Sequence, residues 1–292
     1  MPLPETSRLA IADIVFYTPV LILSIIIVVR HGFDRQLGWV FLTFLALIRL
    51  IGNAEEIAAN AQHSNGLFIA ATILNSLGLG PLLLAMIGML RRVQQAVSQD
   101  GVVVKQRLLQ VAARYLNLSR IALLVALVLA AVGSAKLYGS DRSEHSQGIA
   151  LARAGIVIFL VLFLGLVGVT TVLAVATFRS RGPVNIGERR ILYAVVASVP
   201  FLAVRLIFSL LVFFDTTSST FTLRGGNIWV RSFMGVAEEW ITVVLYVAAG
   251  MTAPRIARRE LDVAPHGDTY GLAESQPVHN KAYSAGQNQR GA

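Results

Sequence analysis

Long runs of apolar residues constrain the fold of this 292-residue chain more than any other feature of its sequence. A helix needs about 20 apolar residues to cross a hydrocarbon core about 30 Å thick, and seven runs reach that length. Only 14% of the residues are charged and 55% are hydrophobic, which is too little charge to cover a water-facing surface. The sequence therefore predicts an all-α, polytopic membrane bundle of seven transmembrane helices.

The predicted spans divide the chain into three parts. They cover about residues 10–29, 39–57, 67–90, 118–137, 151–178, 191–214 and 228–251. Residues 1–9 form a short segment before them, and the first run is too long for the apolar part of a signal peptide, so we interpret it as a retained anchor. Residues 10–254 are then the transmembrane domain. Residues 255–292 lack any apolar run and are predicted to be a disordered tail.

The distribution of Lys and Arg predicts the orientation. If the N-terminus is outside, the inner loops and the start of the tail hold fourteen cations and the outer segments hold four. This asymmetry favours an outside or lumenal N-terminus and a cytoplasmic C-terminus. The formal net charge of +9 is then explained by inner loops that face anionic membrane lipid, and we expect no nucleic-acid partner. We expect either an endomembrane, such as the endoplasmic reticulum, or the plasma membrane.

Polar residues recur inside the second predicted span, where an ionisable group costs a few kcal/mol and needs a reason. Arg49, Asn53 and Glu56 follow one another at i, i+4 and i+7, which places them on one helical face. Asn60 continues this face, and Glu55 directly precedes Glu56.

The last predicted span carries a second polar face. Glu239 stands about 100° away from it around the helix. The residues predicted to share this face are Arg231, Gly235, Glu238, Thr242 and Tyr246.

Three further spans place polar groups at a similar depth: Asp13 in the first, Asn75 in the third and Arg205 in the sixth. Because successive spans alternate in direction, these groups fall in the outer half of the bundle together with those of the second span. Glu238 and Glu239 lie near the midplane. We therefore expect five spans to converge on one chamber that opens to the outer or lumenal side.

Two interpretations of these charges are open. Arg49, Arg205 and Arg231 can form ion pairs with the carboxylates that merely hold the helices together. Alternatively, a carboxyl group left without an arginine partner keeps its proton in an apolar site and can donate it. The second interpretation gains weight because the carboxylates outnumber the arginines; they are Asp13, Glu55, Glu56, Glu238 and Glu239.

Missing residue patterns exclude several classes of membrane protein. The chain has no cysteine, and its five histidines lie outside the predicted spans, so haem and zinc sites within the bundle are excluded. The last span has no lysine for a retinal Schiff base, and an Asp-rich motif for Mg²⁺-diphosphate chemistry is missing. We expect no metal and no other cofactor.

Three short motifs carry a resemblance to known proteins. They are Ala12-Asp13-Ile14, the run Arg49-Leu50-Ile51-Gly52-Asn53 followed by Glu55-Glu56, and Glu238-Glu239-Trp240. With them the chain resembles a group of fungal seven-helix membrane proteins of unassigned function, over about residues 5 to 260. More loosely, it is similar to the fungal integral membrane terpene cyclases of meroterpenoid pathways.

The cyclase resemblance implies a function in secondary metabolism without a metal. Such cyclases protonate an epoxide or olefin with membrane-embedded acids, one in an early span and one near the C-terminus. By position these would be Glu56 and Glu238, with Glu55 and Glu239 as substitutes.

We therefore expect a membrane-bound enzyme that acts on a lipophilic, isoprenoid-type substrate by acid-initiated cyclisation or isomerisation. Trp240, Tyr246 and Phe208 offer aromatic faces to a developing carbocation, although ordinary packing explains such residues equally well. The residues expected to bind substrate are Asp13, Arg49, Asn53, Arg205, Arg231, Trp240 and Tyr246. The alternatives are a proton-coupled transporter or lipid translocator, in which the same acids relay protons, and a seven-helix sensor.

Overall fold

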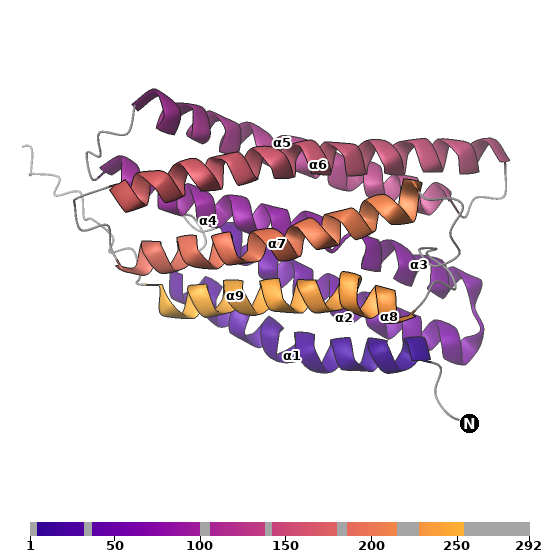
Figure 1. Ribbon diagram of the computed structural model, residues 1–292. Helices are drawn as coiled ribbons and strands as arrows, with labels where there is room; N and C mark the ends of the chain where they lie inside the picture. Colours follow the sequence, from indigo (N-terminus) through magenta and orange to yellow (C-terminus); the bar gives the residue numbers. More distant parts are fainter. Residues whose placement is uncertain are drawn as a thin grey trace, which may run out of the picture. The chain divides into compact units, whose positions relative to one another are not determined.

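Helices make up nearly all of the described part of the computed structural model, which comprises residues 5–31, 37–99, 106–137, 142–179, 186–214 and 228–253 (Figure 1). The predicted tail, residues 255–292, lies outside this range. The helices are α1 (Glu5–His31), α2 (Leu37–Gln62), α3 (Asn65–Ser76), α4 (Leu79–Gln99), α5 (Gln106–Lys136), α6 (Arg142–Arg179), α7 (Ile186–Phe214), α8 (Ile228–Arg231), the π-helical turn η2 (Ser232–Ala237) and α9 (Glu238–Thr252).

Six helical segments are long and apolar enough to cross a membrane. They are Glu5–His31, Asn65–Ser98, Arg107–Lys136, Ser143–Phe178, Ile186–Phe214 and Trp229–Thr252. These six segments confirm the prediction of an all-α membrane protein with several crossings. The seventh predicted span, in α2, is not among the six; it was the most polar of the predicted spans, and it carries Arg49, Glu55 and Glu56.

Successive runs of the chain alternate in direction along the bundle, with α3 and α4 forming one run and α8, η2 and α9 another (Figure 1). We call the end at which α1 begins the proximal end and the other the distal end. Helices α2, α5 and α7 finish at the proximal end, where α3, α6 and α8 begin. Helix α9 finishes at the distal end.

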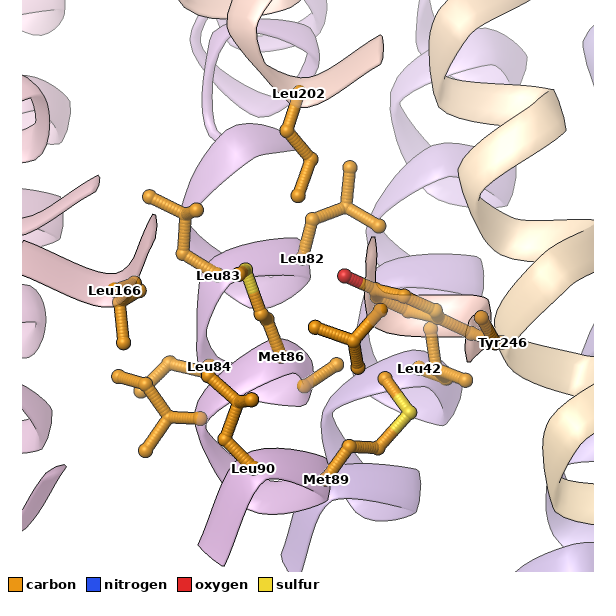
Figure 2. Close-up of a cluster of buried hydrophobic side chains, with 14 of the residues drawn as sticks. Leu42, Leu82, Leu83, Leu84, Met86, Met89, Leu90, Leu166, Leu202 and Tyr246 are labelled. Carbon is orange, nitrogen blue, oxygen red and sulfur yellow. The ribbon is translucent and has the colours of Figure 1, made fainter. Parts of the chain in front are cut away.

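Helix α4 is the centre of the bundle. It packs against α2, α5, α6 and α7, and each residue from Leu79 to Ile87 is buried. A helix that is apolar on all sides is stable only when neighbours cover every side. Figure 2 shows the side chains of Leu82, Leu83 and Met86 interleaved with residues of α2, α6, α7 and α9.

The outer surface is apolar as well. On α5, the side chains of Leu118, Ile121 and Val128 are all more than half exposed, and Val161 and Leu164 on α6 are similarly exposed. In water such a surface would be unfavourable, whereas in a bilayer it faces hydrocarbon at no cost. The exposed surface therefore supports the membrane assignment independently of helix length.

A buried ion pair joins α4 to the first turn of α7 at the distal end. Arg92 donates to Glu188 through Nε and Nη2, with three nitrogen–oxygen distances between 3.0 and 3.2 Å. Both side chains are over 90% buried. Glu188 also lies at the N-terminus of its helix, where the helix dipole favours a negative charge.

We predict that Glu188→Gln lowers the thermal unfolding midpoint of the detergent-solubilised protein by roughly 6 °C or more, since breaking a buried pair costs about 3–5 kcal/mol. Glu144→Gln, at an exposed position on α6, is the matched control and should leave the midpoint unchanged. The exchange of both residues, Arg92→Glu with Glu188→Arg, should recover part of the loss. Equal midpoints for Glu188→Gln and the control would contradict a structural role for this pair.

Candidate functional site

Two buried charged residues, Arg49 of α2 and Glu239 of α9, form an ion pair. Nε of Arg49 donates to Oε1 of Glu239 at 2.6 Å, and Nη2 donates to Oε2, so the contact is bidentate. The Tyr17 hydroxyl of α1 donates to the same Oε1 at 2.6 Å. Nη2 of Arg205, on α7, lies 3.6 Å from Oε2. One carboxylate thus binds groups from three other helices.

A second carboxylate is linked to this pair through an amide. Asn75 of α3 accepts from Nη1 of Arg49 at 3.2 Å and donates to Glu56 at 3.0 Å. Glu56 also accepts from Arg231 of α8 at 3.0 Å. Glu56 and Glu239 are therefore each paired with arginine.

Asp13 of α1 has a different environment, because its partners in the described chain are neutral. It accepts from the Trp240 indole at 2.8 Å and from the Asn53 amide at 3.3 Å. The Trp240 ring stacks on Phe16 with centroids 4.5 Å apart. We use the name charged cluster for Asp13, Tyr17, Arg49, Asn53, Glu56, Asn75, Arg205, Arg231, Glu239 and Trp240.

The helix of the third predicted span is interrupted beside this cluster. The sequence predicts one helix over residues 67–90, but α3 ends at Ser76 and α4 begins at Leu79. Gly78 lies in the interruption, where an added Cβ would be 3.0 Å from Cζ of Arg49 and 2.9 Å from Oε2 of Glu239. Glycine is therefore needed for the ion pair to approach the backbone this closely.

A second backbone irregularity lies in the last span. Residues Ser232–Ala237 form the π-helical turn η2 directly before Glu238. Gly235 of this turn faces Arg205, with Nη1 at 3.0 Å from the position of an added Cβ. π-turns of this kind are rare and concentrate at functional sites.

The π-turn also explains why Glu238, one member of the predicted polar face of this span, does not take a buried position. A π-turn contains more residues per turn than an α-helix, so counting from Arg231 at α-helical spacing gives the wrong rotation beyond it. Glu239, not Glu238, takes the buried position above Thr242 and Val243. Glu238 is only half-buried.

Three predicted site residues lie apart from these pairs. Oε2 of Glu55 and Oε2 of Glu238 are inaccessible and have no hydrogen-bond partner within the described residues. Tyr246 is seven residues beyond Glu239, about 10 Å along the helix. Its hydroxyl meets Ser198 at 3.0 Å, and its ring lies in the apolar core (Figure 2). The structure therefore separates Tyr246 from the charged cluster.

The sequence assigned no role to Tyr17, Gly78 or the pair of Arg92 and Glu188. Tyr17 lies one turn after Asp13, and this spacing is the signal that could have linked it to the cluster. The run Gly78-Leu79-Gly80-Pro81 is a typical helix-breaking pattern. Across the described ranges, no group of three or more His, Asp or Glu side chains is arranged as a metal site.

The fold and the cluster together define the class of protein: a polytopic helical membrane protein with a buried network of charges. The chain belongs to the family described as Domain of unknown function (DUF7702), whose model matches residues 3–256. No curated protein and no solved structure gives a significant match. These comparisons show no similarity to terpene cyclases, so cyclase chemistry is a proposal and not a family property.

We predict that Gly78→Ala lowers the thermal midpoint by roughly 6 °C or more, because the new methyl group would displace the buried pair of Arg49 and Glu239. Gly168→Ala is the matched control, since an added Cβ there has no atom within 4 Å. It should leave the midpoint unchanged or raise it slightly. If Gly78→Ala is as stable as this control, the interruption is not required by the ion pair.

Proposed function

We propose that the chain is a membrane-bound enzyme that converts a lipophilic, isoprenoid-type substrate by acid-initiated cyclisation or isomerisation. The observation that carries this proposal is the state of Glu238. Its Oε2 is inaccessible and without a hydrogen-bond partner in the described chain, next to a cluster whose other buried carboxylates are satisfied. A carboxyl oxygen that is shielded from water and has no hydrogen-bond donor is unfavourable as part of a charged carboxylate.

The pairing pattern selects Glu238 among the candidate acids. Glu56 and Glu239 are each bound by an arginine. Glu55 has an unpartnered oxygen among the described residues as well. Glu238 differs from Glu55 in its surroundings: Arg205 lies beside Gly235, about one turn before Glu238, so it would stabilise the carboxylate that remains after proton transfer.

The reaction needs no other reagent. The proton of Glu238 adds to an olefin carbon, or to an epoxide oxygen whose C–O bond then breaks, and a carbocation forms. The cation rearranges or closes a ring and then loses a proton to the Glu238 carboxylate, which restores the acid. The aromatic faces of Phe208 and Trp240 would stabilise the cation. The product is an isomer of the substrate.

We further propose seven crossings, with α2 as the seventh, and an outside or lumenal N-terminus. The proximal end is then the outer end, and the charged cluster lies in the outer half of the bundle. Arg91, Arg107, Arg114 and Arg190, at the distal end, would face the anionic inner leaflet, as the positive-inside rule requires. An endomembrane or the plasma membrane would supply the lipophilic substrate directly from lipid.

A second candidate function is a proton-coupled transporter, and the interruption between α3 and α4 favours it. Many transporters place broken helices at the binding site, because the freed backbone groups and side chains there can bind a substrate or ion. In such a protein Glu238 would carry a proton across the membrane and would not transfer it to a substrate.

The enzyme proposal predicts that Glu238→Gln abolishes product formation while the protein still accumulates in membranes. Membranes that contain the chain would be incubated with farnesol, geranylgeraniol and epoxysqualene, and isomers of unchanged mass would be detected by gas chromatography and mass spectrometry. Glu144→Gln should keep full activity. Product formation by Glu238→Gln at the normal rate per molecule would end the acid assignment, and proton-dependent uptake without an isomer would favour the transporter.

The proposed topology can be tested directly because the natural chain has no cysteine. Single cysteines would be introduced at His63 and Gln147 at the proximal end and at Ser98 and Arg190 at the distal end. A membrane-impermeant maleimide should label the first two in intact cells and the last two only after permeabilisation. Labelling of Ser98→Cys in intact cells would contradict the proposed orientation.

A further inference from the structure

The guanidinium of Arg205 differs from the other buried arginines of the bundle. Arg49 donates three hydrogen bonds to side chains, and Arg92 donates three to Glu188. Arg205 is over 90% buried, yet its nearest carboxylate oxygen is 3.6 Å away, which is longer than a hydrogen bond. Its Nε has no hydrogen-bond partner among the described residues.

Such an arrangement is costly. A guanidinium carries five N–H donors and keeps its charge in proteins. When it is buried without hydrogen-bond acceptors, it loses its hydrogen bonds to water and gains none from the protein. Glu239 does not require Arg205, because Arg49 binds it with both arms and Tyr17 donates to it as well. Ion-pair stability alone therefore gives no reason to bury this second arginine.

The surroundings of Arg205 leave space beside its guanidinium. Gly235 of the π-turn presents no side chain beside Nη1. The Phe208 ring lies 5.8 Å from Cζ and provides an apolar, electron-rich wall. Glu238, whose Oε2 has no hydrogen-bond partner among the described residues, directly follows this turn. The π-turn therefore connects the surroundings of Arg205 to a carboxyl group with an unpartnered oxygen.

We propose that Arg205 binds a neutral oxygen atom of a lipophilic ligand, such as a hydroxyl, ether or carbonyl oxygen, and that Glu238 contacts the same polar group. This inference rests on the proposed function in that the ligand is the substrate. A hydrocarbon would leave the donors of Arg205 unsatisfied. A carboxylate ligand would lie near the negative charge of Glu239 and be repelled by it. An oxygen-bearing isoprenoid satisfies the donors without adding charge.

The first test needs no ligand. Arg205→Met removes an unsatisfied buried charge and replaces it with a flexible apolar chain, so the thermal midpoint of the ligand-free protein should stay unchanged or rise. Arg49→Met removes the principal partner of Glu239 and should lower the midpoint by roughly 6 °C or more. If Arg205→Met is as destabilising as Arg49→Met, Arg205 is a structural partner of Glu239 and the inference is overturned.

The second test measures binding without turnover. Farnesol should raise the midpoint of the purified natural chain, whereas farnesene and farnesoate should not. The farnesol shift should vanish in Arg205→Met and persist in Arg153→Met, the control, whose guanidinium binds the backbone oxygen of Phe213 near the end of α7. An equal shift by farnesene, a larger one by farnesoate, no shift by farnesol, or a shift that survives in Arg205→Met would each overturn the inference.

The enzyme proposal and the inference about Arg205 can be refuted independently of each other. If farnesol binds through Arg205 but no isomer forms with any of the supplied isoprenoids, the binding inference stands and the enzyme proposal falls. If isomers form through Glu238 although Arg205→Met leaves substrate affinity unchanged, the enzyme proposal stands and the inference falls.

Discussion

The bidentate pair of Arg49 and Glu239 is the interaction on which the architecture of this bundle depends. Removing two charges from water costs several kcal/mol for each, and their attraction compensates only when the remaining donors and acceptors are satisfied. Tyr17 and Asn75 satisfy them, which brings α1 and α3 to the contact between α2 and α9. The relative positions of four helices, and the interruption at Gly78, follow from this requirement.

The charges of the bundle are arranged in two layers separated by apolar packing. From Gly78, beside the charged cluster, to Arg92 the chain advances fourteen residues of α4, which is roughly 20 Å of helix. Between these levels α4 is buried on all sides among leucines and methionines (Figure 2). This apolar layer is thinner than a hydrocarbon core of about 30 Å, and the Arg92–Glu188 pair lies at its distal side.

In the layer of charges at the proximal end, some polar groups have hydrogen-bond partners and others do not. Glu56, Glu239 and Asp13 have partners, whereas Nε of Arg205 and Oε2 of Glu238 have none among the residues described. Buried polar groups in native proteins are nearly always paired, and exceptions concentrate where a protein exchanges stability for function. The π-turn at Ser232–Ala237 lies between these two groups and is a further local cost at the same place.

The sequence by itself determined the all-α membrane class, the approximate spans and the depth at which the polar residues meet, because helix length and apolar runs are local properties. It also indicated that Arg49, Asn53 and Glu56 share a buried face, since a regular helix repeats every 3.6 residues. Only the tertiary structure decided that Glu239 and not Glu238 meets Arg49, that Asn75 links it to Glu56, and that Arg205 is left with unsatisfied donors. These pairings depend on where five helices stand relative to one another, and the interruption at Gly78 and the π-turn change the rotation of two of them. Helical periodicity cannot carry a prediction across such breaks, because the side-chain packing that produces them comes from distant parts of the chain.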